Sequence, residues 1–271
     1  MYKRQDVHFS YTVDVTLGLD ETQVLRRCRS PKAKAAEEYK YTLPVNRRQS
    51  AFRPVVVGFG PAGMFAGLIL AEAGLRPIVL ERGKDIQRRQ QDVNAFWQQH
   101  ILNEESNVQF GEGGAGTFSD GKLTTGIKSP FIRQVLQELY EAGAPEEILY
   151  AAKPHIGTDV LSRIVKAMRE EIVGLGGQVR FLSRVTDFIV EQGRLMAVMV
   201  NGNERIDTHS ARDTFEVLLE RGIPMEAKAF AVGLRVQHPQ VLINRSQYGM
   251  EECGELGPAS YKVTKQTTGG R

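Results

Sequence analysis

Apolar residues follow two different periods along the chain, and the clearest change of period lies between residues 54 and 81. Two short apolar runs, Val55–Val57 and Arg76–Leu80, enclose an apolar stretch of helical length at Pro61–Ala73. A strand, a helix and a second strand of these lengths form a βαβ unit with parallel strands. The pattern therefore predicts an α/β fold built on a parallel sheet.

Further elements are predicted downstream by the same two periods. Apolar residues at helical spacing favour helices, and short β-branched runs bounded by Gln192-Gly193 and Asn201-Gly202 favour strands joined by tight turns, because both turn positions tolerate positive φ. We expect helices over Lys84–His100, Phe131–Ala142, Asp159–Val173 (with Thr158 as its N-cap) and Ala211–Glu220, and strands over Gln178–Leu182, Arg184–Val190, Leu195–Val200 and Ala229–Val236.

Residues 1–50 are predicted to form a separate small, basic α+β module. Apolar and polar residues alternate over Asp6–Leu17, which indicates a strand, and a short helix is expected over Glu21–Arg27 with Asp20 as its cap. A second strand is expected over Tyr39–Val45, and the polar run Asn46–Arg53 is typical of a linker. Residues 51–271 then form the main domain.

Charge is unevenly distributed between these two parts. Residues 1–53 hold 11 Lys and Arg against 6 Asp and Glu, whereas the whole chain carries a net charge of +3. A basic segment can contact nucleic acid or an acidic partner. Its basic residues are scattered and few aromatic residues lie among them, so a solvated surface is favoured and nucleic-acid binding is not expected.

The overall composition is that of a globular protein of 271 residues, with 41% hydrophobic and 25% charged residues. Cys28 and Cys253 lie far apart and form no C-x-x-C pair, so no metal site is expected. The polar N-terminus predicts no secretory signal, and we expect a cytoplasmic protein. Residues 54–71 carry no charge, but two prolines and four glycines interrupt them, so no membrane span is expected.

The turn between the first predicted strand and helix carries the spacing G-x-G-x-x-G. Gly58 permits a tight turn, Gly60 lets a diphosphate approach the backbone, and Gly63 lets the helix pack close to the strand. The positive end of the helix dipole favours phosphate there. Glu81 ends the second strand, where its carboxylate can accept hydrogen bonds from ribose hydroxyls. This spacing predicts a dinucleotide site; the alternative is an ordinary βαβ unit without a ligand.

A second glycine-rich segment follows at residues 111–121, where five of eleven residues are glycine. Glycines permit concave arrangements of N–H groups that bind anions, and Thr117, Ser119 and Lys122 add hydroxyls and a cation. A loop of this length inside a domain is typically functional. It is predicted to form a second contact surface for a diphosphate or a flat ring, and a flexible surface loop is the alternative.

These motifs together resemble a known family. The run Gly58-Phe-Gly-Pro-Ala-Gly63 with Glu81-Arg82 resembles the FAD-binding half of glutathione-reductase-like flavoproteins. The segment Gly113–Leu123, with Pro154–Asp159 and His209–Asp213, resembles the uncharacterised bacterial FAD-dependent dehydrogenases. The resemblance implies a Rossmann-like FAD-binding domain with a three-stranded β-meander at residues 178–200, and an oxidoreductase acting on a small-molecule substrate.

The resemblance also implies which residues meet the cofactor. Those near the diphosphate would be Gly58, Gly60, Pro61, Ala62 and Gly63. Glu81, followed by Arg82, would meet the adenosine ribose, and Val185 would contact adenine through its backbone. The residues implied near the phosphates or the flavin are Gly114, Ala115, Gly116, Thr117, Ser119, Asp120 and Lys122.

Two departures from the family pattern are visible. Family members place a short apolar strand ending in glycine before the His209–Asp213 run, and here Arg205–Thr208 leads directly into it. They also continue past Arg271 with a late glycine-rich segment. The resemblance therefore implies an internally shortened and C-terminally truncated member, with an inserted substrate domain beginning near residues 223–271.

Candidates for chemistry are fewer, because a flavin itself carries hydride or electron transfer. Lys122 is a candidate cation near the flavin, His155 a candidate proton donor, and His209 a candidate to face the flavin. Their alternatives are a solvated or phosphate-contacting lysine, a hydrogen-bonded loop histidine and a helix cap. NADH or NADPH is a possible electron donor.

Three functions remain open at this point. They are an FAD-dependent oxidoreductase, a non-catalytic dinucleotide-binding module whose basic N-terminus meets a partner such as RNA, and an NAD-dependent dehydrogenase. A Rossmann-like fold is compatible with all three.

Overall fold

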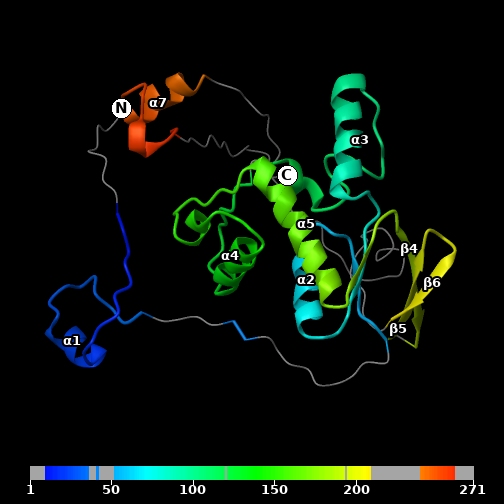
Figure 1. The fold of residues 1–271 in the computed structure, drawn as a ribbon, viewed down its shortest axis with the longest axis horizontal. Helices are drawn as coiled ribbons and strands as arrows, with labels where there is room; N and C mark the ends of the chain where they lie inside the picture. The colour runs from blue at the N-terminus through cyan, green and yellow to red at the C-terminus, as the bar shows by residue number, and fades with distance from the viewer. Residues whose placement is uncertain are drawn as a thin grey trace, which may run out of the picture. The chain divides into compact units, whose positions relative to one another are not determined.

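The computed structural model describes residues 10–36, 41–42, 52–119, 121–192, 194–208 and 239–259. These residues fall into two units (Figure 1). One unit is continuous and spans Glu38–Pro224, and the other combines Met1–Glu37 with Met225–Arg271. The candidate residues that can be placed all belong to the continuous unit. The domain boundary expected at residue 50 stays a prediction.

A parallel sheet of three short strands forms the centre of the continuous unit. The strands are β1 (Val55–Val57), β2 (Ile78–Leu80) and β3 (Gln178–Arg180), and they lie side by side in that order. Val56 pairs with Val79, which pairs with Val179. The predicted βαβ unit is therefore confirmed. The second strand begins at Ile78 rather than at Arg76, because Arg76 adopts a positive φ of 49°.

Two helices cover one face of this sheet. They are α2 (Pro61–Glu72) and α5 (Thr158–Gly174), which lie side by side in Figure 1. Val56 and Val79 point into this face, and a Cβ added to Gly67 of α2 would lie 3.1 Å from Val79. Gly157, with φ of 90°, is the N-cap of α5, so the predicted cap at Thr158 is wrong by one residue. Glycine adopts this backbone conformation without a Cβ clash.

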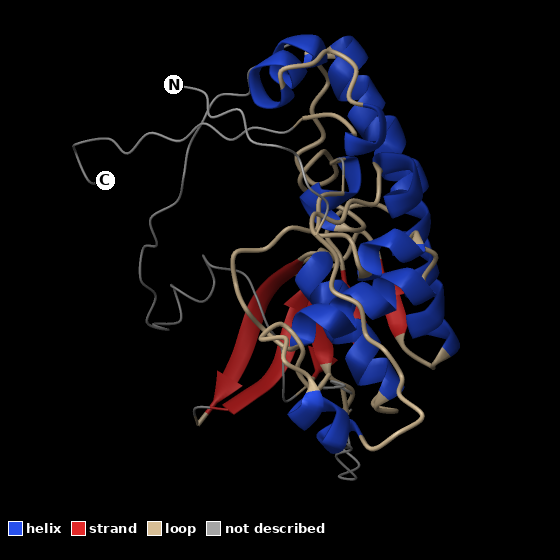
Figure 2. Cartoon of the chain, turned by 90° about the vertical axis from the view of Figure 1, so that its left-hand side faces the viewer, coloured by secondary structure: helices blue, strands red, loops and turns tan. Residues whose placement is uncertain are grey.

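The other face of the sheet is covered by an antiparallel meander. Its strands are β4 (Val185–Glu191), β5 (Arg194–Val200) and β6 (Glu204–Asp207), which appear as the long red arrows of Figure 2. Side chains alternate between the faces of a strand, so Val55 and Leu80 point to the meander. They pack there in a second apolar cluster with Val185, Phe188, Val198 and Val200.

The meander is shifted along the chain from its predicted place. Residues 178–200 were expected to supply all three strands, but Gln178–Arg180 completes the parallel sheet and β6 is the third strand of the meander. A three-residue segment with one apolar residue, Val179, suits either sheet, and only its pairing with β2 decides. The turn before β6 is as predicted: Asn201 and Gly202 have φ of 51° and 76°.

The remaining helices surround these layers. They are α3 (Ile86–Gln99), α4 (Phe131–Glu141) and the short 3₁₀ helices η1 (Gly114–Phe118) and η2 (Glu146–Leu149). Asp85 caps α3 by accepting hydrogen bonds from the first helical N–H groups, so α3 begins two residues after the predicted Lys84. The predicted α/β class and its Rossmann-like arrangement with a three-stranded meander are confirmed.

Four glutamates from α2, α4 and α5 form an acidic cluster. It consists of Glu72 at the end of α2, Glu138 and Glu141 on α4, and Glu171 on α5. Burial, followed by the charges of the other three, raises the pKa of Glu72 to about 7. Burial also raises the pKa of Glu138. The folded chain therefore holds protons here that it would release on unfolding near neutral pH.

The second unit contains α1 (Glu21–Arg27), α7 (Gln240–Tyr248) and the 3₁₀ turn η3 (Gly254–Leu256). The predicted helix Glu21–Arg27 is confirmed with its cap, because the carboxylate of Asp20 accepts from the N–H groups of Thr22 and Gln23. In this unit Asn244 is buried and bonds to the backbone of Glu251 and Ala259.

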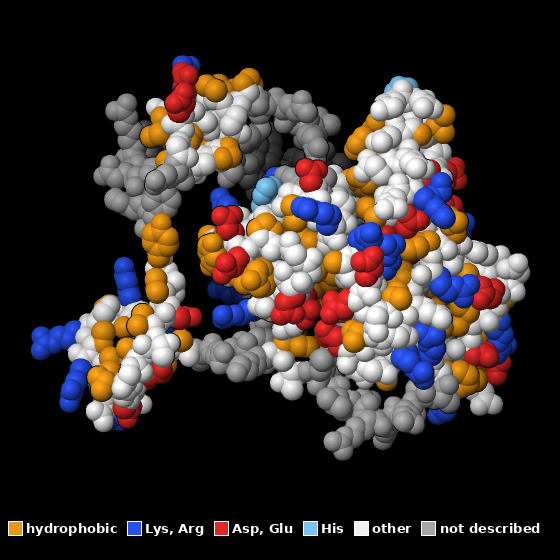
Figure 3. Space-filling view, in the orientation of Figure 1, with side chains coloured by type: hydrophobic (Ala, Val, Ile, Leu, Met, Phe, Trp, Pro, Cys, Tyr) orange, Lys and Arg blue, Asp and Glu red, His pale blue; other side chains and the backbone are white. Residues whose placement is uncertain are grey.

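The strand predicted over Asp6–Leu17 is absent from its described part. Residues 10–17 form no strand, and Tyr11, Val13 and Val15 expose 79%, 73% and 68% of their surface. Hydrophobic side chains, in orange, are visible on the surface of the described chain in Figure 3. A strand requires a neighbour for its backbone hydrogen bonds, and this segment pairs with none of the described strands. Tyr41 and Thr42 are likewise not in a strand; the rest of that prediction lies outside the described residues.

The helix expected over Ala211–Glu220 and the strand expected over Ala229–Val236 also lie outside the described residues. Among the helices that the structure describes, none has the length and apolar character needed to cross a bilayer.

Candidate dinucleotide-binding site

The turn between β1 and α2 has the geometry that its three glycines predict. Gly58 adopts φ of 88°, and its N–H donates to the carbonyl oxygen of Leu80 at 2.7 Å. A Cβ added to Gly63 would lie 1.9 Å from the carbonyl oxygen of Gly58. No side chain fits there, so the first turn of α2 rests directly on the end of β1.

The N-terminus of α2 is open for a ligand. Gly60 is its N-cap, Pro61 is its first residue, and no side chain caps it. The first N–H groups of a helix have no intrahelical acceptor, so those of Ala62 and Gly63 are left to another partner. A Cβ added to Gly60 would meet only the Cα of Gly114, at 3.9 Å. The backbone is therefore accessible at Gly60.

Glu81 lies at the end of β2, and its carboxylate joins three loops. The side chain is 4% exposed. Oε2 accepts the N–H of Phe59 at 2.7 Å, and Oε1 accepts those of Gly83 at 2.8 Å and Gly111 at 3.1 Å. A carboxylate oxygen has two lone pairs, so Oε1 is saturated and Oε2 can accept one further hydrogen bond. This structural role was not predicted.

Arg82, the next residue, points elsewhere. Its Nε donates to the carboxylate of Glu105 at 2.5 Å, and its guanidinium lies 4.5 Å from the ring centre of Phe110. This pair, led by the hydrogen bond from Arg82, holds the pKa of Glu105 below its usual range. Arg82 therefore fixes the loop that precedes the glycine-rich segment.

The glycine-rich segment packs against the turn, although the two lie far apart in the sequence. Gly111, Gly113 and Gly114 have φ of 116°, 79° and 63°, and the N–H of Gly113 donates to the carbonyl of Phe59 at 2.8 Å. A Cβ added to Gly114 would lie 3.1 Å from the Cα of Gly60. The two glycine motifs, separate in sequence, thus form one surface.

The other residues predicted in this segment take different positions. Ala115, Gly116 and Thr117 lie in η1, next to the start of α2. The hydroxyl of Thr117 is turned inward, because it is 2% exposed and donates to the carbonyl of Glu112 at 3.1 Å. The hydroxyl of Ser119 donates to the carbonyl of Gly116 at 2.7 Å. Asp120 lies outside the described residues.

The structure brings two of the three candidate catalytic residues together. Lys122 and His155 form an antiparallel β-bridge. Backbone hydrogen bonds from Leu123 to Pro154 and from Ile156 to Gly121 extend this pairing. His209 lies outside the described residues.

Val185, predicted to contact adenine through its backbone, begins β4. Its side chain is 5% exposed and packs in the apolar cluster between the meander and the parallel sheet.

Arg89 on α3 is a residue that the motif-based prediction missed. It is fully buried, and its guanidinium lies 4.7 Å from the ring centre of Phe118. Burial lowers its pKa to about 10, and the nearby charges of Glu81 and Glu112 oppose that effect. It therefore stays protonated at neutral pH. A signal was present: Arg89 shares the buried face of α3 with Ile86 and Val93, where an apolar residue is expected.

The guanidinium of Arg89 holds the glycine-rich segment and the loop before it through their backbone. Four of its five N–H groups donate to carbonyl oxygens. The acceptors are Asn107 at 2.8 Å, Val108 at 2.9 Å, Glu112 at 2.5 Å and Gly114 at 2.8 Å.

Glu112 is the second fully buried charged residue of this region. Its Oε2 accepts the N–H of Ile86 at 2.7 Å and lies 3.2 Å from the guanidinium of Arg169 on α5. Its Oε1 has no hydrogen-bond partner among the described residues. Burial raises the pKa of this carboxyl. Glu112 thereby connects the glycine-rich segment to the start of α3 and to Arg169 of α5.

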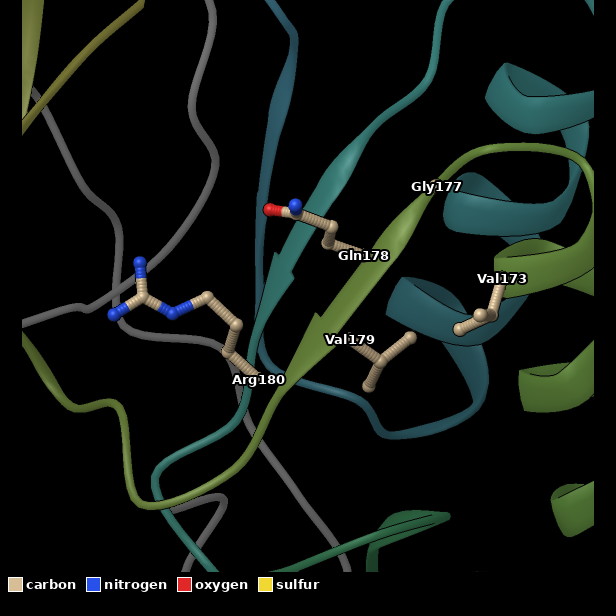
Figure 4. A pocket seen from close by; sticks show the side chains of 5 residues that line it. All are labelled: Val173, Gly177, Gln178, Val179 and Arg180. Atoms are coloured by element: carbon tan, nitrogen blue, oxygen red, sulfur yellow. The ribbon is translucent and has the colours of Figure 1, made fainter.

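Two hollows of the described part lie outside the β1–α2 turn. One of 460 Å³ borders the outer edge of β3 and is lined by Val173, Gly177, Gln178, Val179 and Arg180 (Figure 4). The other, of 230 Å³, lies beside α4 and includes Leu123, Ile127 and Phe131. Neither contains a residue of the β1–α2 turn. The described residues contain no group of three or more His, Cys, Asp or Glu suited to a metal ion.

The sequence is similar to one protein family and to one longer bacterial protein. A family described as "FAD-dependent protein, C-terminal domain-like" matches residues 229–271. An uncharacterised protein from Clostridium beijerinckii is 46% identical over 275 residues, which cover 98% of this chain and 51% of the relative. The chain thus spans about half the length of that relative.

Among solved structures, parts of the chain are similar to two oxidoreductases. L-proline dehydrogenase from P. horikoshii matches with 12% identity and a TM-score of 0.44, over 65% of this chain and 57% of that one. Glycine oxidase from Bacillus cereus matches with 13% identity and a TM-score of 0.39, over 59% and 54%.

Proposed function

We propose that this chain binds FAD and belongs functionally to the FAD-dependent oxidoreductases. The observation that carries the proposal is the packing of the glycine-rich segment against the β1–α2 turn, where Gly114 faces Gly60. Open N–H groups at a helix N-terminus beside a backbone free of Cβ atoms suit a diphosphate. The match of residues 229–271 to a family described as FAD-dependent supports FAD as the dinucleotide.

The proposed roles follow from the donors and acceptors at this surface. The N–H groups of Ala62 and Gly63 meet the diphosphate. Glu81 accepts one ribose hydroxyl through Oε2, because Oε1 already accepts two backbone N–H groups. A carboxylate at this position opposes a 2′-phosphate. Val185 offers its backbone to adenine.

Bound FAD supplies hydride or electron transfer, and the residues of this chain bind and orient it. The pairing of Lys122 with His155 brings a cation and an imidazole onto neighbouring backbone segments. We propose these two, together with His209, as the groups that face the flavin. NADH or NADPH is the proposed electron donor, a small molecule the substrate, and the cytoplasm the compartment.

The alternative is a non-catalytic dinucleotide-binding module, because the open start of α2 offers donors to a diphosphate whether or not the bound ligand reacts. In that case FAD binds but is not reduced by NADH or NADPH.

The test is binding by the purified full chain. Isothermal titration with FAD, ADP and NAD⁺, together with the absorption spectrum of released flavin, separates the possibilities. We expect FAD and ADP to bind, with FAD the tighter ligand. Binding of NAD⁺ with no binding of FAD would refute the proposal, and bleaching of the bound flavin by NADH would distinguish an oxidoreductase from a binding module.

Two matched glycine variants locate the site. Gly60→Val places a branched side chain where the diphosphate approaches, so we expect loss of FAD and ADP binding. Gly126→Val is the control, because a Cβ at Gly126 meets nothing within 4 Å. Circular dichroism checks that both variants are folded. Unchanged affinity of a folded Gly60→Val protein would remove the site from this turn.

A further inference from the structure

Arg89 is placed to do more than fill space beneath the glycine-rich segment. A buried arginine satisfied by backbone carbonyls is costly to desolvate, and a buried apolar side chain carries no such cost. Gly111 makes room for it, since a Cβ there would lie 2.5 Å from the Cδ of Arg89. Unlike an apolar side chain, Arg89 fixes the orientation of the four carbonyl groups that it binds.

The direction of a carbonyl fixes the direction of the next N–H. In a trans peptide the C=O of one residue and the N–H of the following residue point to opposite sides, and the chain contains no cis peptide among its described residues. The Glu112 carbonyl points at Arg89, and the N–H of Gly113 accordingly points away and donates to Phe59 in the β1–α2 turn.

The same geometry applies two residues later. The Gly114 carbonyl also points at Arg89, at 2.8 Å, so the N–H of Ala115 points away from Arg89. Ala115 is the second residue of η1, and the first N–H groups of a helix have no acceptor within it. Gly114 itself packs against Gly60 and Pro61. The Ala115 N–H therefore points out of the segment on the side opposite Arg89, next to the open start of α2.

We propose that Arg89 is a positioning residue for the diphosphate: by holding the Gly114 carbonyl beneath the segment, it turns the Ala115 N–H outward as a phosphate donor. This inference rests on the proposed dinucleotide function and adds to it a buried residue that touches no ligand. The Ala115 N–H, turned outward by Arg89, and the open start of α2 then contribute donors to one phosphate group. The planar fork of arginine is required, because four carbonyls are bound by three different nitrogen atoms.

The test uses the full chain with Arg89→Lys and Arg89→Met. Lysine keeps the positive charge but offers one nitrogen in place of three, and methionine keeps the apolar stem alone. Arg88→Lys is the control, because Arg88 is the neighbouring arginine and its side chain is 65% exposed. ADP and adenosine are titrated into each protein, followed by NMR so that weak binding of adenosine is measured. The amide resonance of Ala115 is followed in the wild-type protein.

The expected result is selective for the phosphates. Arg89→Lys should lose affinity for ADP by about 10- to 100-fold, the range for one hydrogen bond to a charged group. Its affinity for adenosine should be unchanged, as should both affinities of Arg88→Lys. In the wild-type protein, the Ala115 amide proton should shift downfield with ADP and not with adenosine.

Each other outcome overturns the inference at a definite step. Equal loss of ADP and adenosine would make Arg89 a general support of the fold, and unchanged affinity for ADP would remove any role in binding. If neither variant folds, the wild-type titration decides, because an Ala115 amide that does not respond to ADP refutes the donor. A wild-type protein that binds neither ADP nor FAD refutes the proposed function itself.

Discussion

Replacing Glu81 with glutamine tests whether this carboxylate is a structural junction that holds three loops together. The substitution conserves shape but changes one oxygen into an NH₂ group. The least costly orientation keeps the amide oxygen at Oε1, where it accepts from Gly83 and Gly111, and turns the NH₂ towards the N–H of Phe59. One buried donor is then left without an acceptor, which costs about 1–3 kcal/mol.

Alanine at position 81 removes all three acceptor contacts. Three buried N–H groups lose their partner, and because water entering the vacated space replaces part of the loss, we expect a destabilisation of about 3–6 kcal/mol. That is a large share of a typical folding free energy of about 5–15 kcal/mol. The two variants should therefore differ clearly.

The assay is urea unfolding of the protein without ligand, followed by circular dichroism, from which the free energy of unfolding is obtained. Glu191→Gln is the matched control, since Glu191 is an exposed residue at the end of β4 and should change stability by less than about 0.5 kcal/mol. If Glu81→Gln were as stable as the control, or if the glutamine and alanine variants lost equal stability, the carboxylate would not hold the three loops.

Two further predictions concern the same unit. Gly63→Ala should destabilise the protein by about 3 kcal/mol or more in the same unfolding assay, because its Cβ would meet the Gly58 carbonyl at 1.9 Å; a stable variant would mean that the turn relaxes freely. Glu72→Gln should raise stability at pH 8 and change it far less at pH 5. The folded pKa of Glu72 is about 7 against an ordinary value of 4.5, so the folded state binds the extra proton and loses stability as pH rises through that window. Equal effects at both pH values would exclude this titration.

Much of the central fold was predictable because its signals are local. The glycine turn and the apolar runs at β1 and β2 each depend on residues within one turn or strand; the turn and β1 form as expected, and β2 forms from Ile78 onward. In the other unit the cap at Asp20 is equally local and is also formed as predicted. The strand expected over Asp6–Leu17 had an equally regular pattern, yet residues 10–17 form none. Alternation alone does not make a strand, because a strand also needs a partner that the pattern does not specify.

The meander shows that strands can be predicted correctly while their pairing partners are not. Three strands were expected in residues 178–200, and strands do form there, but β3 pairs with β2 while β6 replaces it in the meander. Both sheets offer a backbone edge and an apolar face to a run such as Gln178–Arg180. The choice depends on α5, which delivers β3 beside β2 as a parallel neighbour.

By itself, the sequence determined the β1–α2–β2 unit, its glycine turn and the presence of a second glycine-rich segment. Only the tertiary structure decided that Gly114 lies against Gly60, that Glu81 is bound by three backbone N–H groups, and that Arg89 gathers four carbonyls beneath the segment. The reason is physical. A turn is specified by the conformational freedom of its own residues, whereas hydrogen bonds between loops far apart in sequence depend on where packed helices and strands place the backbone.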